Sequence, residues 1–86
     1  MYYVYVIMNE KKEMYIGYTN DLEARLKNHN AGYNDSTKGH EWRYVYYEAF
    51  QSEEDARHRE KMLKHHGQSK RQLKNRIQSS IEETWK

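Results

Sequence analysis

The alternation of apolar and polar residues predicts three strands. Residues 2–8 are aromatic and β-branched with apolar side chains on both faces, which is typical of a central strand. Residues 14–18 predict a second strand, most simply the hairpin partner of the first across the polar turn 9–13. Residues 42–50 predict a third strand, aromatic on both faces. Gly17 weakens the second strand, so we expect the backbone there to be approached closely by another element or a ligand.

Three helices are predicted between and after these strands. The first begins at Asn20, which with Glu23 resembles a capping box, and runs to about Asn30. Gly32 is a plausible left-handed terminator of this helix. A second helix begins at Ser52 and carries three acids in its first turn, Glu53, Glu54 and Asp55.

The third helix is predicted to begin at Ser69, with Gln72 completing a second capping box. Its apolar stripe consists of Leu73, Ile77 and Ile81. The predicted order is therefore β-β-α-β-α-α, a compact α/β domain.

The composition restricts the class of protein. The chain has 86 residues, enough for one domain with a thin core, and nine of its residues are tyrosine. The absence of cysteine excludes disulfides, thiolate zinc sites and a thiol nucleophile. No apolar run approaches the roughly 20 residues of a membrane span, and no signal peptide precedes the first strand. We therefore expect a soluble, cytoplasmic protein that does not enter a membrane.

The charge is distributed unevenly along the chain. Residues 1–56 hold six Lys/Arg against ten Asp/Glu, whereas residues 57–76 hold eight Lys/Arg against one acid. The whole chain has a net charge of only +2. A concentrated basic segment on an acidic domain suggests a polyanionic partner. A solvated helix face of Lys and Arg is the other explanation, and charge alone does not decide between them.

Two helices carry polar residues where a purely structural helix would be apolar. On the first, Arg25 and His29 share the stripe of Leu22 and Leu26. A lone histidine on such a stripe is most often a hydrogen-bonded packing residue. On the second, Glu60 lies on the core side, where an unpaired carboxylate would cost several kcal/mol.

Glu60 therefore needs a cation. One interpretation is a buried ion pair with Arg25. The other is a single carboxylate ligand for a hydrated divalent ion, a role that suits Mg²⁺ because Mg²⁺ commonly keeps several waters.

Five elements in order resemble the GIY-YIG nuclease superfamily. Its second motif is intact as Tyr15-Ile16-Gly17, and its first survives as Tyr3-Val4-Tyr5, in which Tyr replaces the glycine and Val the isoleucine. The family arginine, histidine and acid match Arg25, His29 and Glu60.

The resemblance covers residues 2–77 and is most similar to the small standalone bacterial members. Asn28–Gly32, Thr37 and the strand that begins at Trp42 add to this similarity. It implies that residues 1–86 form a single GIY-YIG-like domain with a three-stranded antiparallel sheet flanked by helices. The implied activity is metal-dependent hydrolysis of phosphodiester bonds, as in homing and restriction endonucleases and the incision subunit of bacterial nucleotide-excision repair.

The resemblance also implies roles for individual residues. Glu60 would hold Mg²⁺ or Mn²⁺, and Arg25 would bind the non-bridging phosphate oxygens. Tyr5 is favoured as the base that activates water, with Tyr15 positioning water or phosphate. His29 is the alternative base, since its intrinsic pKa is better suited to neutral pH. The residues expected to bind substrate are Gly17, Thr19, Asn30, Lys61, Lys64, Lys70, Arg71 and Lys74.

Two other functions remain open at this stage. The domain is alternatively a catalytically inactive nucleic-acid-binding module whose basic segment follows the phosphates. A structural interaction domain, with Arg25 and Glu60 as a buried salt bridge, is the third reading. The expected partner is nucleic acid, most simply structured or single-stranded DNA, bound by a monomer or a weak homodimer.

Overall fold

The fold is built on a three-stranded sheet with the order β2-β1-β3. A computed structural model describes all residues 1–86. The strands are β1 (Tyr2–Asn9), β2 (Met14–Thr19) and β3 (Trp42–Phe50). β1 pairs with β2 along one edge and with β3 along the other, in both cases antiparallel. It is therefore the central strand, as its apolar side chains on both faces predicted.

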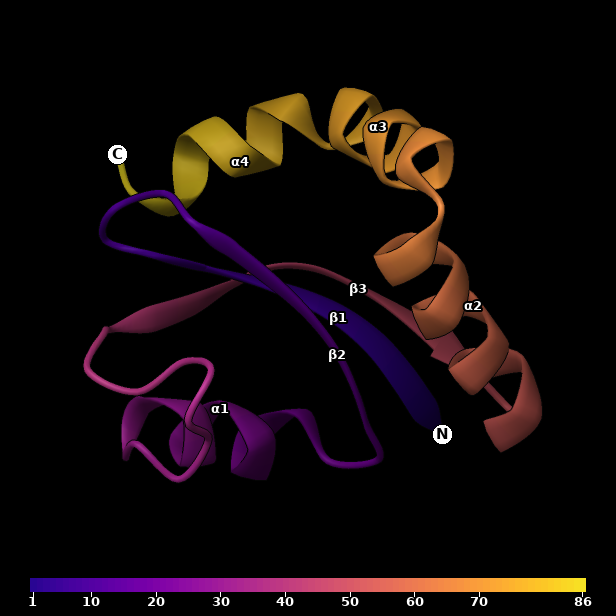
Figure 1. Cartoon of the computed structure of the whole chain (residues 1–86), viewed down its shortest axis with the longest axis horizontal. Coiled ribbons are helices and arrows are strands. Elements are labelled where there is room, and N and C mark those ends of the chain that lie inside the picture. Colours follow the sequence, from indigo (N-terminus) through magenta and orange to yellow (C-terminus); the bar gives the residue numbers. More distant parts are fainter.

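Helices cover the two faces of the sheet unequally (Figure 1). The single helix α1 (Leu22–Asn30) lies on one side. On the other side, an arc is formed by α2 (Glu53–His65), α3 (Gly67–Arg76) and α4 (Gln78–Thr84). The predicted α/β class with an antiparallel sheet flanked by helices is confirmed, with one helix more than expected.

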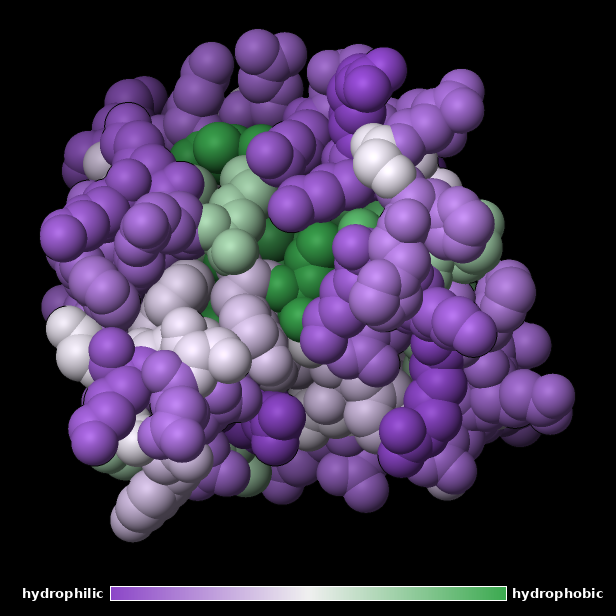
Figure 2. All heavy atoms as spheres, viewed as in Figure 1, coloured by the Kyte–Doolittle hydropathy of each residue, from purple (hydrophilic) through white to green (hydrophobic).

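Each face of the sheet has its own small core. Between the sheet and the arc of helices, the buried residues are Val4, Val6, Ile16, Ala56, Leu63, Leu73 and Ile77. Under α1 the buried cluster is Tyr5, Ile7 and Trp42. Hydrophilic residues dominate the face seen in Figure 2, and the strongly apolar atoms on it gather near its middle and top. Only 16 of the 86 residues are buried, so the core is thin, as the composition indicated.

The start of α1 differs from the prediction. Its N-cap is Asp21, whose side chain accepts a hydrogen bond of 3.1 Å from the backbone N–H of Ala24, so the assignment of Asn20 is wrong. The reason lies in Thr19, whose Oγ1 accepts from the Asp21 N–H and donates to the Asp21 carbonyl. This local turn places Asp21 at the first free N–H groups of the helix. At the other end, Gly32 has a φ of +82°, which confirms it as the left-handed terminator.

The C-terminal helices also differ from the prediction. Ser52 caps α2 as expected, but α3 begins at Gly67, two residues before Ser69, and has no side-chain cap. The predicted continuous helix is broken at Ile77, which has φ −112° and ψ 24°. The break turns the chain toward β3, and beyond α4 the indole of Trp85 donates to the Met8 carbonyl.

Gly17 is required by the side chain that lies across from it. It pairs with Tyr5 in the register of β1 and β2, and the Tyr5 ring extends over it. A Cβ atom at Gly17 would overlap the phenol, with the ring Cε2 only 2.9 Å away. The close approach expected from the sequence is thus made by Tyr5.

We predict that Gly17→Ala destabilises the fold by about 1–3 kcal/mol, because the added methyl group forces the Tyr5 ring out of its position. Urea unfolding measures this loss. Gly67→Ala is the matched control, since nothing lies within 4 Å of its added Cβ. Equal stability of the Gly17→Ala variant and the wild type would contradict the assignment.

Candidate active site

Three predicted catalytic residues meet beside the edge strand β2. Tyr5 projects from β1 over Gly17, and its hydroxyl lies 2.7 Å from Nε2 of His29. The Nε–H of Arg25 donates to the same hydroxyl oxygen at 3.2 Å. Arg25 and His29 come from one face of α1, as their spacing predicted. The Tyr5 hydroxyl therefore contacts both the guanidinium of Arg25 and the imidazole of His29.

Tyr15 completes this group from β2. Its ring lies 5.1 Å from the ring of His29, centre to centre, in an edge-on arrangement. Its hydroxyl accepts a hydrogen bond of 3.5 Å from the side-chain amide of Asn34. Both sequence motifs thus contribute a tyrosine to the same side of the sheet.

Glu60 approaches from α2 together with Lys64. The two side chains form an ion pair of 3.1 Å one helical turn apart. The ammonium of Lys64 also lies 5.5 Å from the centre of the Tyr15 ring, which ties α2 to β2. Arg25 binds Tyr5 and makes no ion pair with Glu60, so the predicted alternative of a buried Arg25–Glu60 pair is not found.

The electrostatics at Tyr5 combine opposing influences. Burial raises the pKa of the Tyr5 phenol, and the hydrogen bond and charge of Arg25 only partly offset this rise. The hydrogen bond to Tyr5 raises the pKa of Arg25, with smaller contributions from the charges of Tyr15 and Glu60. Arg25 is therefore a permanent cation that favours the phenolate form of Tyr5.

His29 is neutral at physiological pH. Its side chain is almost fully buried, and this burial lowers its pKa below the usual 6.5, with a further contribution from the positive charge of Arg25. A neutral imidazole has one protonated and one unprotonated nitrogen. His29 is thus able to accept a proton.

The site offers few side chains that could bind a metal. No group of three or more His, Asp or Glu side chains is arranged to bind an ion. Glu60 is a single hard carboxylate, 22% exposed, whose partner Lys64 is 36% exposed. A partly exposed pair of this kind, one helical turn apart, is weak and easily displaced. A single carboxylate suits a hydrated Mg²⁺ or Mn²⁺ ion that keeps most of its waters, and these residues do not form a site with several protein ligands.

Three residues expected to bind substrate have internal contacts. Gly17 accommodates the Tyr5 ring, and Thr19 shapes the turn before α1. The side chain of Asn30 bonds both the N–H and the C=O of Trp42, fixing the start of β3. Their binding of substrate stays a prediction.

The predicted phosphate-binding cations divide into two groups. Lys64 lies in the site itself, in contact with Glu60 and Tyr15. The others form no ion pair: Lys61, Arg71 and Lys74 are exposed on α2 and α3, and Lys70 of α3 is half-buried. In Figure 1, α3 lies on the opposite side of the sheet from α1, the helix that carries Arg25 and His29.

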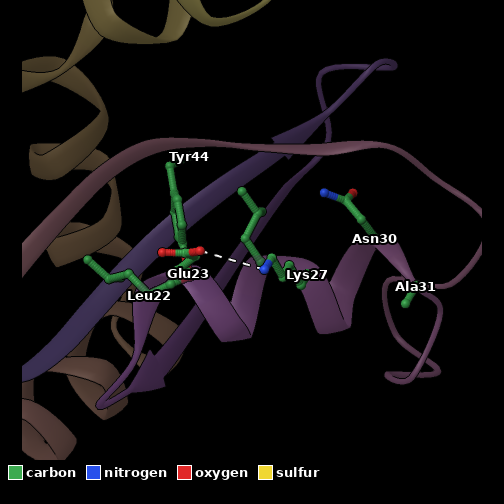
Figure 3. A pocket seen from close by; sticks show the side chains of 7 residues that line it. Leu22, Glu23, Lys27, Asn30, Ala31 and Tyr44 are labelled. Carbon is green, nitrogen blue, oxygen red and sulfur yellow. Dashed lines mark hydrogen bonds and ion pairs between the residues drawn. The ribbon is translucent and has the colours of Figure 1, made fainter.

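The largest hollow of the surface is a different feature. It has a volume of about 730 Å³ and lies between α1 and Tyr44 of β3 (Figure 3). Its lining includes Asn30 but none of the predicted catalytic residues. The exposed ion pair of Glu23 and Lys27 stands at its border. The hollow is therefore distinct from the site around Tyr5.

Two residues of the site were missed as site residues in the sequence. Thr37 is fully buried, and its hydroxyl lies 2.8 Å from Nδ1 of His29. Asn34 contacts both Thr37, through its carbonyl, and Tyr15, through its amide. The signal available was the turn-forming sequence Asn34-Asp35-Ser36-Thr37, in which the Asn side chain accepts from the Ser36 N–H. This sequence predicts a turn, but it does not predict that the Thr37 hydroxyl is buried against His29.

The chain belongs to the GIY-YIG family, a family of nucleases: the model of the GIY-YIG catalytic domain matches residues 1–79. The observed sheet and the convergence of both tyrosine motifs agree with this assignment. Membership of a nuclease family implies that the domain binds nucleic acid.

Similar proteins occur in bacteria. A UPF0213 protein of Clostridium perfringens is 38% identical over 66 residues, which cover 74% of this chain and 71% of the relative. A UPF0213 protein of Streptococcus pyogenes is 42% identical over 69 residues, covering 72% and 70% respectively. No solved structure matches the chain significantly. None of the helices has the combination of length and hydrophobicity needed to cross a bilayer.

The buried, neutral His29 predicts a pH dependence of stability. Its folded pKa is lower than the unfolded value of about 6.5. Between these two values the unfolded chain binds the proton and the folded chain does not, so the free energy of unfolding falls as the pH falls below about 6.5. One proton contributes at most about 1.4 kcal/mol per pH unit. Urea unfolding at a series of pH values measures the slope.

Two variants isolate the contribution of His29. His29→Gln should remove this part of the slope, whereas His65→Gln, at an exposed position, should retain it. Slopes that are identical in the wild type and in His29→Gln would show that His29 is not the responsible group.

Proposed function

We propose that this protein is a divalent-metal-dependent endonuclease that hydrolyses phosphodiester bonds in nucleic acid, with structured or single-stranded DNA as the preferred substrate. The observation that carries the proposal is the Tyr5 hydroxyl, held between Arg25 at 3.2 Å and His29 at 2.7 Å. Membership of the GIY-YIG family supports the reaction class.

Arg25 has the geometry of a phosphate ligand. It contacts Tyr5 through Nε alone, and its two terminal nitrogens form no hydrogen bond or ion pair within the protein. These nitrogens are the donors that bind two oxygens of one phosphate in a bidentate manner. Arg25 therefore binds a phosphodiester while it keeps its contact with Tyr5.

Tyr5 and His29 form a path for the proton of water. As the water oxygen bonds to phosphorus and the bond from phosphorus to the 3′-oxygen breaks, Tyr5 takes the proton of water and passes its own to Nε2 of His29. The charge of Arg25 stabilises phenolate character on Tyr5 during this transfer. Because Tyr5 is fully buried, the water has to reach its oxygen past the half-buried side chains of Arg25 and Tyr15.

Glu60 is the residue that holds the metal in this proposal. A bound Mg²⁺ or Mn²⁺ supplies positive charge to the phosphoryl oxygens and to the leaving 3′-oxygen. Lys64 lies 5.5 Å from the Tyr15 ring and would be free to contact a phosphate if Glu60 held a metal. The free cations of α2 and α3 extend the basic surface for further phosphates of the strand.

We predict that Glu60→Gln and Arg25→Ala each lower cleavage by at least about 100-fold, because each removes charge that stabilises the transition state. The measurement is a cleavage screen over a panel of structured DNA and RNA substrates, with Mg²⁺, Mn²⁺ or EDTA. Glu23→Gln and Lys27→Ala are matched controls, since they remove charges of the same signs from exposed positions on α1.

Full cleavage by folded Glu60→Gln and Arg25→Ala proteins would refute the proposed site. A wild-type protein that binds nucleic acid but cleaves no substrate with any divalent ion would identify an inactive binding module instead.

Tyr5→Phe tests the proposed base. The substitution keeps the ring that packs over Gly17 and removes the hydroxyl, so we expect a folded protein with kcat lowered by about 10²–10⁴-fold. Tyr44→Phe is the control, because the Tyr44 ring contacts Tyr5 at 5.6 Å but its hydroxyl donates to the Leu22 carbonyl, outside the proton path. Unchanged turnover of Tyr5→Phe would eliminate Tyr5 as the base.

A further inference from the structure

A chain of buried hydrogen bonds continues behind His29, away from Arg25. The Tyr5 hydroxyl lies 2.7 Å from Nε2 of His29, and the Thr37 hydroxyl lies 2.8 Å from Nδ1 of the same ring. The Thr37 hydroxyl in turn donates to the Asn34 carbonyl at 3.3 Å. His29 is 1% exposed and Thr37 is fully buried, so solvent does not replace these partners.

The two ends of this chain determine the direction of every proton in it. At one end, Arg25 is always a donor, so the proton of Tyr5 has only His29 Nε2 as its acceptor. At the other end, the Asn34 carbonyl is always an acceptor and takes the single proton of Thr37. The Thr37 oxygen then accepts from Nδ1–H of His29. The Arg25 end requires the tautomer protonated on Nδ1, and the Thr37 hydroxyl supplies the acceptor that this tautomer needs.

The opposite tautomer would leave groups unsatisfied. With the proton on Nε2, both Arg25 and His29 would donate to the Tyr5 oxygen, and the buried proton of Tyr5 would have no acceptor. Buried polar groups without partners are strongly disfavoured. In this structure no buried side-chain nitrogen or oxygen lacks a partner.

We propose that Thr37 is a positioning residue that holds His29 in the tautomer protonated on Nδ1, so that Nε2 is free to receive the proton of Tyr5. The inference rests on the proposed function for its role in the reaction, and on the hydrogen-bond geometry alone for the tautomer. Wrong tautomers of a catalytic histidine are known to lower turnover severely while the fold is retained.

The loop of Thr37 is anchored independently of the Thr37 hydroxyl. The indole of Trp42 donates to the Thr37 carbonyl at 2.7 Å, and the Thr37 N–H donates to the Asn34 carbonyl at 3.1 Å. The Asn34 side chain accepts from the Ser36 N–H at 2.9 Å. These contacts persist when the hydroxyl is removed, so Thr37→Val, which keeps the shape of the side chain, changes the proton pattern and preserves the loop.

The test is a long-range ¹H–¹⁵N spectrum of histidine-labelled protein, which distinguishes the two tautomers without any substrate. We expect His29 of the wild type to be protonated on Nδ1. In Thr37→Val the preference for Nδ1 should weaken and a population protonated on Nε2 should appear, because a methyl group cannot accept the Nδ1 proton, and in Thr37→Ser the wild-type pattern should return. The signals of the exposed His58 and His65 serve as internal controls.

The proposal is overturned if wild-type His29 is protonated on Nε2, or if folded Thr37→Val retains the wild-type tautomer. Should Thr37→Val fail to fold, Thr37→Ala provides the same loss of the hydroxyl with less bulk, and the same two outcomes apply. Urea unfolding establishes that each variant is folded before its spectrum is interpreted.

Cleavage kinetics separate the role in the reaction from the proposed function itself. We expect Thr37→Val to lower kcat by at least about tenfold with KM unchanged, and Thr37→Ser to restore it. A tautomer switch in Thr37→Val with full kcat would overturn the positioning role and leave the nuclease function intact. If the wild type cleaves nothing, the proposed function fails, while the spectra still decide whether Thr37 sets the tautomer.

Discussion

The passage of the Tyr5 ring over Gly17 is the contact on which the arrangement of the site depends. Tyr5 belongs to the central strand, which is covered on both faces and has no direct route to substrate. A side chain at position 17 would fill the space of the phenol. Since glycine leaves that space empty, the hydroxyl reaches across the edge strand to α1, where Arg25 and His29 meet it. Gly17, a residue that is unfavourable in a strand, thus allows a core tyrosine to reach the site.

Much of the fold follows from short-range signals in the sequence. The three strands are rich in tyrosine and β-branched residues, and the apolar character of residues 2–8 on both faces identified the central one. One error in the predicted helix boundaries occurs where two neighbouring residues are both suited to be the N-cap. Asn20 and Asp21 are both good caps, and the hydrogen bonds of Thr19 select Asp21. The break at Ile77 depends on tertiary contacts of α4 with β3, which no local pattern reveals.

The candidate site was predictable to the extent that its residues disturb a regular pattern. Arg25 and His29 interrupt an apolar stripe, and Glu60 lies toward the core, so each was noticeable in the sequence. Thr37 disturbs nothing, because a threonine in a polar loop is ordinary. Only the fold shows that its hydroxyl is fully buried against His29. His29 and Thr37 are 8 residues apart, one in a helix and one in a loop. Their spacing in the sequence does not reveal that their polar groups meet.

The separate placement of Arg25 and Glu60 affects how readily the site accepts ligands. Had the two formed a buried ion pair, breaking it would cost about 3–5 kcal/mol before a phosphate or a cation gained any contact. In the structure, Glu60 instead pairs with the half-exposed Lys64 one turn away, a contact worth about 0.3–0.5 kcal/mol. Arg25 contacts Tyr5 through its Nε alone, and its two terminal nitrogens form no hydrogen bond. Both charges are therefore held by contacts that the phosphate and the divalent ion of the proposed reaction would supplement or displace at little cost.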